Sequence, residues 1–311
     1  MTAVLVLAAV AAGCVQAAAV LATATWPRRS PAAAIVLWQA IGLSWGLATV
    51  GTLIGLGAAR QRSGIAGGAL RQLAGFASGR GLPSFGVLAA ARLASLAAGL
   101  VLLSLLVWIL LAVFGAALRA RQRQRDLLGL LAHGDPKVPG ALVVDYPAAA
   151  AYCLPGLRSA IVISAGTLDL LDSAELAAVL AHERAHLRER HDLVLLPFIA
   201  LMHGFRWSHA VRDAHQAVAQ LVEMHADDRV LRHRPARELA TALLRVGAAG
   251  GGHAPSGALA VAEPDLGGEV AARVTRLLRP APSLSLPALA LVGAVAALTV
   301  IIPLGLLVVP L

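Results

Sequence analysis

The stretch DSAELAAVLAHERAHL, from Asp172 to Leu187, predicts a helix with a clearly marked beginning. Asp172 is followed three residues later by Glu175, and such a pair forms a capping box in which each side chain accepts a hydrogen bond from the other residue's backbone N–H. Apolar residues then recur at helical spacing, as at Leu176 and Leu180. We therefore expect one side of this helix to be buried.

The same helix carries His182 and His186 one turn apart, with Glu183 between them. Two imidazoles at positions i and i+4 lie on one side of a helix and can both bind one Zn²⁺ ion. Zinc lowers the pKa of a water ligand to about 7. A nearby carboxylate can then take a proton from this water as the water attacks a peptide carbonyl. We interpret the histidines as ligands and Glu183 as the general base; the alternative is a solvated helix with two unrelated histidines.

Catalytic zinc needs three protein ligands, and the segment LVEMHADD, residues 221–228, offers the third. Glu223 and Asp227 are one helical turn apart in it. We expect Glu223 to be the third ligand and Asp227 to orient a ligand histidine through its second ring nitrogen. This is the gluzincin arrangement.

Three neighbouring residues are rival third ligands, but the spacing does not favour them. Asp192 would lie about 9 Å along a continuing helix from His186, which is too far for one ion, and His191 fails for a similar reason. His225, two residues after Glu223, faces away from it. We expect structural or solvent-facing roles for these side chains.

A short β-branched run precedes the helix, namely Ile161, Val162, Ile163 and Ser164. An edge strand beside an active-site helix can pair with an extended substrate, which would make these residues substrate-binding. An ordinary buried strand is the equal alternative.

The chain as a whole is strongly apolar, with 58% hydrophobic residues and a mean hydropathy of +0.75. These values exceed those of soluble domains, and runs rich in Ala, Leu and Gly favour helical spans over a barrel. We predict a mainly α membrane protein with an α+β metallopeptidase domain. The expected segments are two transmembrane helices within 1–58 (3–25 and 34–58), a basic loop at 59–92, a third span at 93–118, the metallopeptidase domain at 119–285 and a fourth span at 287–311.

Arginines near the ends of the spans predict the orientation, because cytoplasmic loops are rich in positive charge. With both termini outside, nine arginines lie on the cytoplasmic side and four on the external side. The nine are Arg28, Arg29, Arg119, Arg121, Arg123, Arg125, Arg273, Arg276 and Arg279, and the four are Arg60, Arg62, Arg71 and Arg80. We expect a cytoplasmic metallopeptidase domain in a multi-pass protein of a bacterial plasma membrane, since the preference for Arg indicates a GC-rich genome.

The formal charge of +9 is explained by this orientation and by contact with anionic lipid, so we expect no direct binding of nucleic acid. Cys14 and Cys153 are far apart and form no disulfide framework. Redox chemistry is not indicated.

Several of these motifs, taken in order, resemble the BlaR/MecR-type membrane metallopeptidases. They are AYCLPG at 151–156, IVISAG at 161–166, LAHERAHLRERHD at 180–192, and Glu223 with Asp227. The resemblance implies a cytoplasmic gluzincin domain between the third and fourth spans, with His182, His186 and Glu223 as zinc ligands, Glu183 as the base and Asp227 as the residue that orients a ligand.

The resemblance also implies a role in signal transduction, in which an external signal leads to cleavage of a winged-helix repressor of the BlaI/MecI type. The chain ends at Leu311, so we expect the short form without the C-terminal penicillin-binding sensor domain. The signal would then reach the protein through the loop at 59–92, through the spans, or through a separate sensor protein.

Two alternatives remain open. One is a quality-control or processing peptidase of the HtpX/Ste24 kind, which places spans between the HExxH helix and the third ligand, whereas here the intervening 36 residues, 187–222, hold only a 13-residue apolar stretch at 193–205. The other is a non-enzymatic membrane receptor or scaffold with a vestigial zinc site. The carboxylate of Glu183 argues against it, because a structural zinc site has no use for a base.

Overall fold

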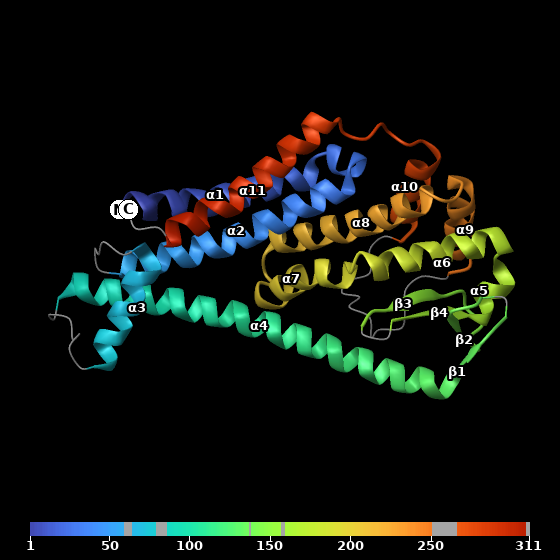
Figure 1. Cartoon of the computed structure of the whole chain (residues 1–311), viewed down its shortest axis with the longest axis horizontal. Helices are drawn as coiled ribbons and strands as arrows, with labels where there is room; N and C mark the ends of the chain where they lie inside the picture. The colour runs from blue at the N-terminus through green and yellow to red at the C-terminus, as the bar shows by residue number, and fades with distance from the viewer. Residues whose placement is uncertain (59–63, 79–85, 137, 157–158, 251–265, 309–311) are drawn as a thin grey trace. The chain divides into compact units, whose positions relative to one another are not determined.

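The computed structural model describes residues 1–58, 64–78, 86–136, 138–156, 159–250 and 266–308 (Figure 1). The chain divides into two compact units. Unit 1 comprises Met1–Ile109, Gly204–Ala214 and Leu284–Leu311, and unit 2 comprises Leu110–His203 and His215–Ser283. Unit 2 therefore begins nine residues before the predicted start of the metallopeptidase domain at 119, and the segment 204–214 belongs to unit 1.

Among the described residues, four helices are long and apolar enough to cross a membrane, as predicted. They are α1 (Thr2–Thr23), α2 (Pro31–Gly57), α4 (Val87–Leu131) and α11 (Leu286–Val308), with a short 3-10 helix η1 (Trp26–Arg29) between the first two. Large apolar side chains such as Leu5, Val101 and Trp108 are exposed on these helices, which suits a lipid environment.

The helices of unit 1 pack through small residues. Gly57 lies against the backbone of Leu96, where any larger residue would clash. The hydroxyl of Ser95 donates a hydrogen bond of 2.8 Å to the Leu53 carbonyl, and that of Ser44 donates one of 2.6 Å to the Thr299 carbonyl. In lipid, which is as apolar as the side chains, helices are held together by close packing and by interhelical hydrogen bonds of this kind.

Two predicted segments of this part of the chain differ in the structure. The segment 59–92, expected as a loop, contains the helix α3 (Gly64–Ala77) and the first turns of α4, while 59–63 and 79–85 lie outside the described residues. The third span is part of a helix of 45 residues, about 67 Å long at 1.5 Å per residue, so α4 extends well past the apolar stretch into the arginine-rich one.

Unit 2 contains a four-stranded sheet in the order β1-β2-β4-β3. Its strands are β1 (Ala132–Gly134), β2 (Ala141–Val144), β3 (Ala151–Leu154) and β4 (Ala160–Ser164). β4 runs parallel to β2 and antiparallel to β3, so it lies inside the sheet. The prediction that Ile161, Val162, Ile163 and Ser164 form an edge strand is therefore wrong, because both of their backbone edges are paired, and β3 is the edge on that side.

Helix α6 (Ser173–Arg188) is buried on two sides. On the side of the sheet, Leu176 and Leu180 pack with Val143, Ile161 and Ile163. On the opposite side, Ala178 packs with residues of other helices, among them Val230, Leu239 and Leu277. The remaining helices of this part of the chain are α5 (Ala165–Leu170), α7 (His191–Gly204), α8 (His209–Leu231), α9 (Ala236–Ala248) and α10 (Leu266–Leu278).

The capping box predicted for α6 is confirmed. Asp172 Oδ1 accepts hydrogen bonds of 2.9 Å from the backbone N–H groups of Ala174 and Glu175, and Glu175 Oε2 accepts one of 3.1 Å from the Asp172 N–H. Arg245 of α9 adds an ion pair of 2.9 Å to Glu175. These contacts fix where α6 begins and hence the position of every residue along it.

We expect Asp172→Ala to lower the free energy of unfolding by about 1 kcal/mol, because two backbone donors of the first turn lose their acceptor. In thermal unfolding of the purified chain this corresponds to a fall in Tm of about 2–4 °C. Asp169→Ala, at an exposed position of α5, is the matched control. Equal melting temperatures for the two variants would contradict the role of the cap.

Candidate metal centre

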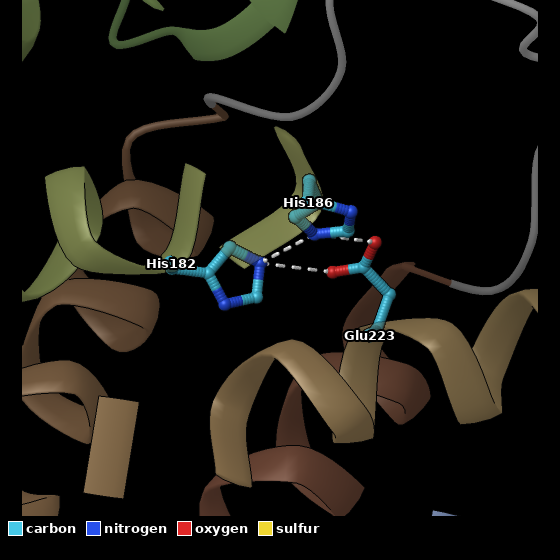
Figure 2. Close-up of side chains that lie close together, drawn as sticks. All are labelled: His182, His186 and Glu223. Atoms are coloured by element: carbon cyan, nitrogen blue, oxygen red, sulfur yellow. Dashed lines mark hydrogen bonds and ion pairs between the residues drawn. The ribbon is translucent and has the colours of Figure 1, made fainter. Parts of the chain in front are cut away.

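Helices α6 and α8 bring three metal-binding side chains together (Figure 2). The Nε2 atoms of His182 and His186 are 3.0 Å apart. Glu223 of α8 approaches both, with Oε2 3.3 Å from His182 Nε2 and Oε1 3.5 Å from His186 Nε2. The three residues that the sequence proposes as ligands therefore converge, although 36 residues separate His186 from Glu223.

The donor set fits zinc. Two imidazole nitrogens and one carboxylate are the protein ligands of many catalytic zinc sites, which keep a fourth position open. His182 is buried, with 7% of its surface exposed, and the ring nitrogens that face one another would repel if both presented lone pairs. A cation between them satisfies both, so His182, His186 and Glu223 are the residues that would hold a zinc ion.

Asp227, one turn after Glu223, lies behind His182. Its Oδ1 is 3.1 Å from His182 Nδ1, a close electrostatic contact. Asp227 is fully buried. Its position agrees with the predicted role, because a carboxylate beside Nδ1 leaves Nε2 to face the ligand cluster.

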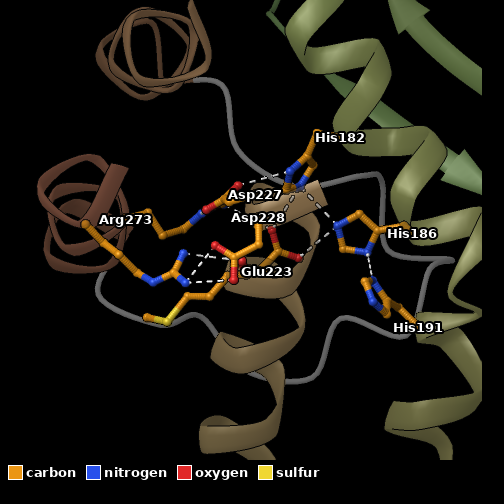
Figure 3. Close-up of polar contacts among 9 residues, drawn as sticks. His182, His186, His191, Glu223, Asp227, Asp228 and Arg273 are labelled. Carbon is orange, nitrogen blue, oxygen red and sulfur yellow. Dashed lines mark hydrogen bonds and ion pairs between the residues drawn. The ribbon is translucent and has the colours of Figure 1, made fainter. Parts of the chain in front are cut away.

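Arg273 of α10 binds two of the carboxylates of α8, those of Asp227 and Glu223 (Figure 3). Its Nε and Nη2 donate hydrogen bonds of 3.0 Å and 2.7 Å to the two oxygens of Asp227. Its Nη1 is 3.0 Å from Glu223 Oε2. The planar guanidinium of an arginine can donate two parallel hydrogen bonds to one carboxylate and still reach a second carboxylate. The ammonium group of a lysine cannot make this two-point contact.

The sequence analysis missed Arg273 and assigned it to the charges that orient the fourth span. Arg276, assigned in the same way, is also an ion-pair partner, since its Nη2 is 2.7 Å from Asp228. A signal for Arg273 exists in α10, where Val270, Val274 and Leu277 form the apolar side that packs inward. Arg273 falls within that stripe at helical spacing, and a charge in such a position needs a buried partner.

The pKa values of the site follow from burial and from these contacts. Burial alone would lower the pKa of His182, but Asp227 and Glu223 outweigh it and raise that pKa to about 10 in the absence of metal. Burial would raise the pKa of both carboxyl groups. His186 and Arg273 nevertheless hold the pKa of Glu223 well below its usual value, and Arg273 with His182 lowers that of Asp227. Both α8 carboxylates are thus ionised and available to a cation.

Glu183 lies on the part of α6 that meets β3. Cys153 of β3 is close enough to Glu183 for the charge of that carboxylate to act on its thiol. Burial raises the pKa of Cys153, and the charge of Glu183 raises it further, so the thiol is neutral rather than a nucleophile. The residue predicted as the general base therefore faces the edge strand of the sheet.

The rival ligands lie outside the cluster. The sequence analysis assumed a continuing helix, but α6 ends at Arg188 and α7 begins at His191. Asp192 is 3.1 Å from Arg121, and His225 is 3.9 Å from Glu189, so each has another partner.

A helix with two histidines and a glutamate, completed by a carboxylate from a second helix, is the arrangement of many zinc metallopeptidases. Residues 117–232 match the sequence model of Peptidase family M48. This segment includes all the predicted ligands, Glu183 and Asp227, but not Arg273. With the four apolar helices it supports a membrane-type zinc metallopeptidase, without singling out the BlaR/MecR type. No curated protein and no solved structure matches the chain.

We expect Arg273→Gln to destabilise the metal-free protein by about 3–5 kcal/mol, because it leaves the buried carboxylate of Asp227 without its guanidinium partner. Chemical unfolding of the purified chain in a chelator measures this loss. Arg279→Gln removes an exposed arginine just beyond α10 and serves as the control. Similar unfolding midpoints for the two variants would show that Arg273 is not needed by the carboxylates.

Proposed function

We propose that the chain is a membrane-embedded zinc endopeptidase of the gluzincin type. The observation that carries the proposal is the convergence of His182, His186 and Glu223. Glu183 lies between the two histidines on α6. A site that only held a structural ion would gain nothing from a carboxylate in the position of Glu183. The same carboxylate argues against a receptor or scaffold with a vestigial site.

The chain's own residues would divide the work of peptide hydrolysis among them. A bound zinc ion supplies Lewis acidity and lowers the pKa of water at the site. Glu183 takes a proton from the attacking water as the oxygen of the water forms a bond to the peptide carbonyl carbon. Glu183 then gives the proton to the amide nitrogen as the C–N bond breaks. Asp227 orients His182 throughout, and Arg273 balances the charge of the two α8 carboxylates.

The substrate would lie along β3 rather than β4. β3 is an edge of the sheet and packs against α6, the helix that carries Glu183. An extended peptide that adds a strand to this edge is held by its backbone, so that its scissile bond is presented to Glu183 with little demand on sequence. Ala151 to Leu154 thus replace Ile161 to Ser164 as the proposed substrate-binding strand.

We propose regulatory proteolysis as the biological role, with a cytoplasmic protein such as a BlaI/MecI-like winged-helix repressor as the substrate and a separate sensor protein as a partner. The support is the order of motifs from AYCLPG to Asp227. The M48 match is equally compatible with quality control or processing of the HtpX/Ste24 kind. Cytoplasmic placement rests on the arginine distribution of nine to four. Three of the nine, Arg121, Arg273 and Arg276, also form ion pairs within the chain.

We expect Glu183→Gln to abolish proteolysis while the protein still binds one zinc ion, because the substitution removes the base and keeps the three ligands. General-base catalysis contributes a factor of about 10²–10⁴, so cleavage should fall at least a hundredfold. Peptide fragments in cells that express either form are compared by mass spectrometry, and zinc is measured in the purified proteins.

The identity of the fragments separates the candidate roles. Loss of one transcriptional repressor fragment in Glu183→Gln cells favours regulatory proteolysis, and loss of fragments from many misfolded membrane proteins favours quality control. Identical fragment patterns, with zinc bound to both forms, would contradict the assignment as a peptidase.

A further inference from the structure

His191 is a buried histidine that touches a predicted metal ligand from behind. It is the first residue of α7, and 3% of its surface is exposed. Its Nδ1 is 3.0 Å from His186 Nδ1 (Figure 3). The two rings meet edge to face, with centroids 4.7 Å apart. His191 thus contacts the ring nitrogen of His186 that faces away from the ligand cluster.

The break between α6 and α7 creates this contact. In an unbroken helix, a residue five positions after His186 would be rotated about 140° away from it. Instead α6 ends at Arg188, and Arg190 adopts a left-handed conformation with φ of 51°. The Arg190 carbonyl accepts a hydrogen bond of 2.8 Å from the Leu193 N–H as α7 begins. The chain therefore turns so that His191 comes back against His186.

The chemistry of a ligand imidazole then fixes the direction of the hydrogen bond. His186 presents Nε2 to His182 and Glu223, so Nε2 must offer its lone pair to a metal ion and the ring proton must reside on Nδ1. That N–H needs an acceptor, and His191 Nδ1 is the atom at hydrogen-bond distance. The acceptor must be a neutral imidazole, with its own proton on Nε2.

We propose that His191 is a positioning residue that acts through His186, accepting a hydrogen bond from its Nδ1–H and thereby holding its Nε2 toward zinc. The inference rests on the proposed zinc site and deepens it. The two ligand histidines then have different supports, a carboxylate for His182 and an imidazole for His186. A neutral acceptor suits the second position, since a further carboxylate there would add charge to a buried cluster that already holds two.

An isosteric pair of variants separates the hydrogen bond from packing. His191→Asn keeps an acceptor close to the position of Nδ1, whereas His191→Leu has nearly the shape of Asn and lacks the acceptor. His215→Leu removes another buried histidine, about two turns before Glu223 on α8, and is the control. Zinc affinity is measured on the purified full-length chains by competition with a chromogenic chelator, and Co²⁺-loaded samples report the ligand geometry through their visible absorption.

We expect His191→Leu to weaken zinc binding about 10–100-fold and to change the Co²⁺ spectrum, as is usual when the partner of a ligand histidine is lost. His191→Asn should recover most of the affinity, and His215→Leu should match the wild type. Wild-type affinity in His191→Leu would overturn the inference, as would an equal loss in folded His191→Asn. If the Leu variant does not fold, the Asn variant decides alone, since a tenfold loss contradicts the inference and a near-native affinity supports it.

A wild-type chain that takes up no zinc would instead defeat the proposed function itself, and this inference with it. That result is distinguishable from the others because it is seen before any substitution is made.

Discussion

The contact of one guanidinium with the buried Asp227 and the half-buried Glu223 holds the centre of unit 2 together. Glu223 and Asp227 project from the same side of α8, and Arg273 of α10 neutralises them at 2.7–3.0 Å. Removing two such charges from water is costly unless a partner is provided at hydrogen-bond distance. The position of Glu223 beside His182 and His186, and of Asp227 beside His182, depends on this arrangement. The candidate metal centre is therefore supported by three helices rather than by the two that supply its ligands.

The contact between His191 and His186 shows how much a local break in a helix can contribute. The left-handed residue Arg190 separates α6 from α7 and turns His191 back onto His186. In an unbroken helix, His186 and His191 would point in different directions, and His191 could not reach the Nδ1 atom of His186. Non-glycine residues with positive φ are uncommon, and they concentrate where the surrounding structure gains from them. The bend at Arg190 is in such a position.

Features that depend on neighbouring residues were predictable from the sequence. The capping box at Asp172, the helix that follows it and the four apolar helices all depend on short-range patterns, and the structure confirms them. The convergence of Glu223 with the two histidines was predicted from the chemistry that zinc requires. The sequence did not predict which strand lies at the edge of the sheet, because strand order depends on pairings between distant segments. The sequence of β4 gives no local sign that it has a neighbour on each side. Arg273 was misread for a related reason, since its partners lie 46 and 50 positions earlier in the chain.

Arg273 also gives the two carboxylates a cation that belongs to the polypeptide. In many small metalloproteins the binding energy of the ion is also the energy of folding, and without metal the ligands repel one another and the chain unfolds. Here the ion pairs between α8 and α10 join Asp227 to Arg273 through groups that the polypeptide itself supplies. The attachment of α10 to α8 therefore draws on side chains alone, so that loss of an ion from the cluster would leave these two helices joined.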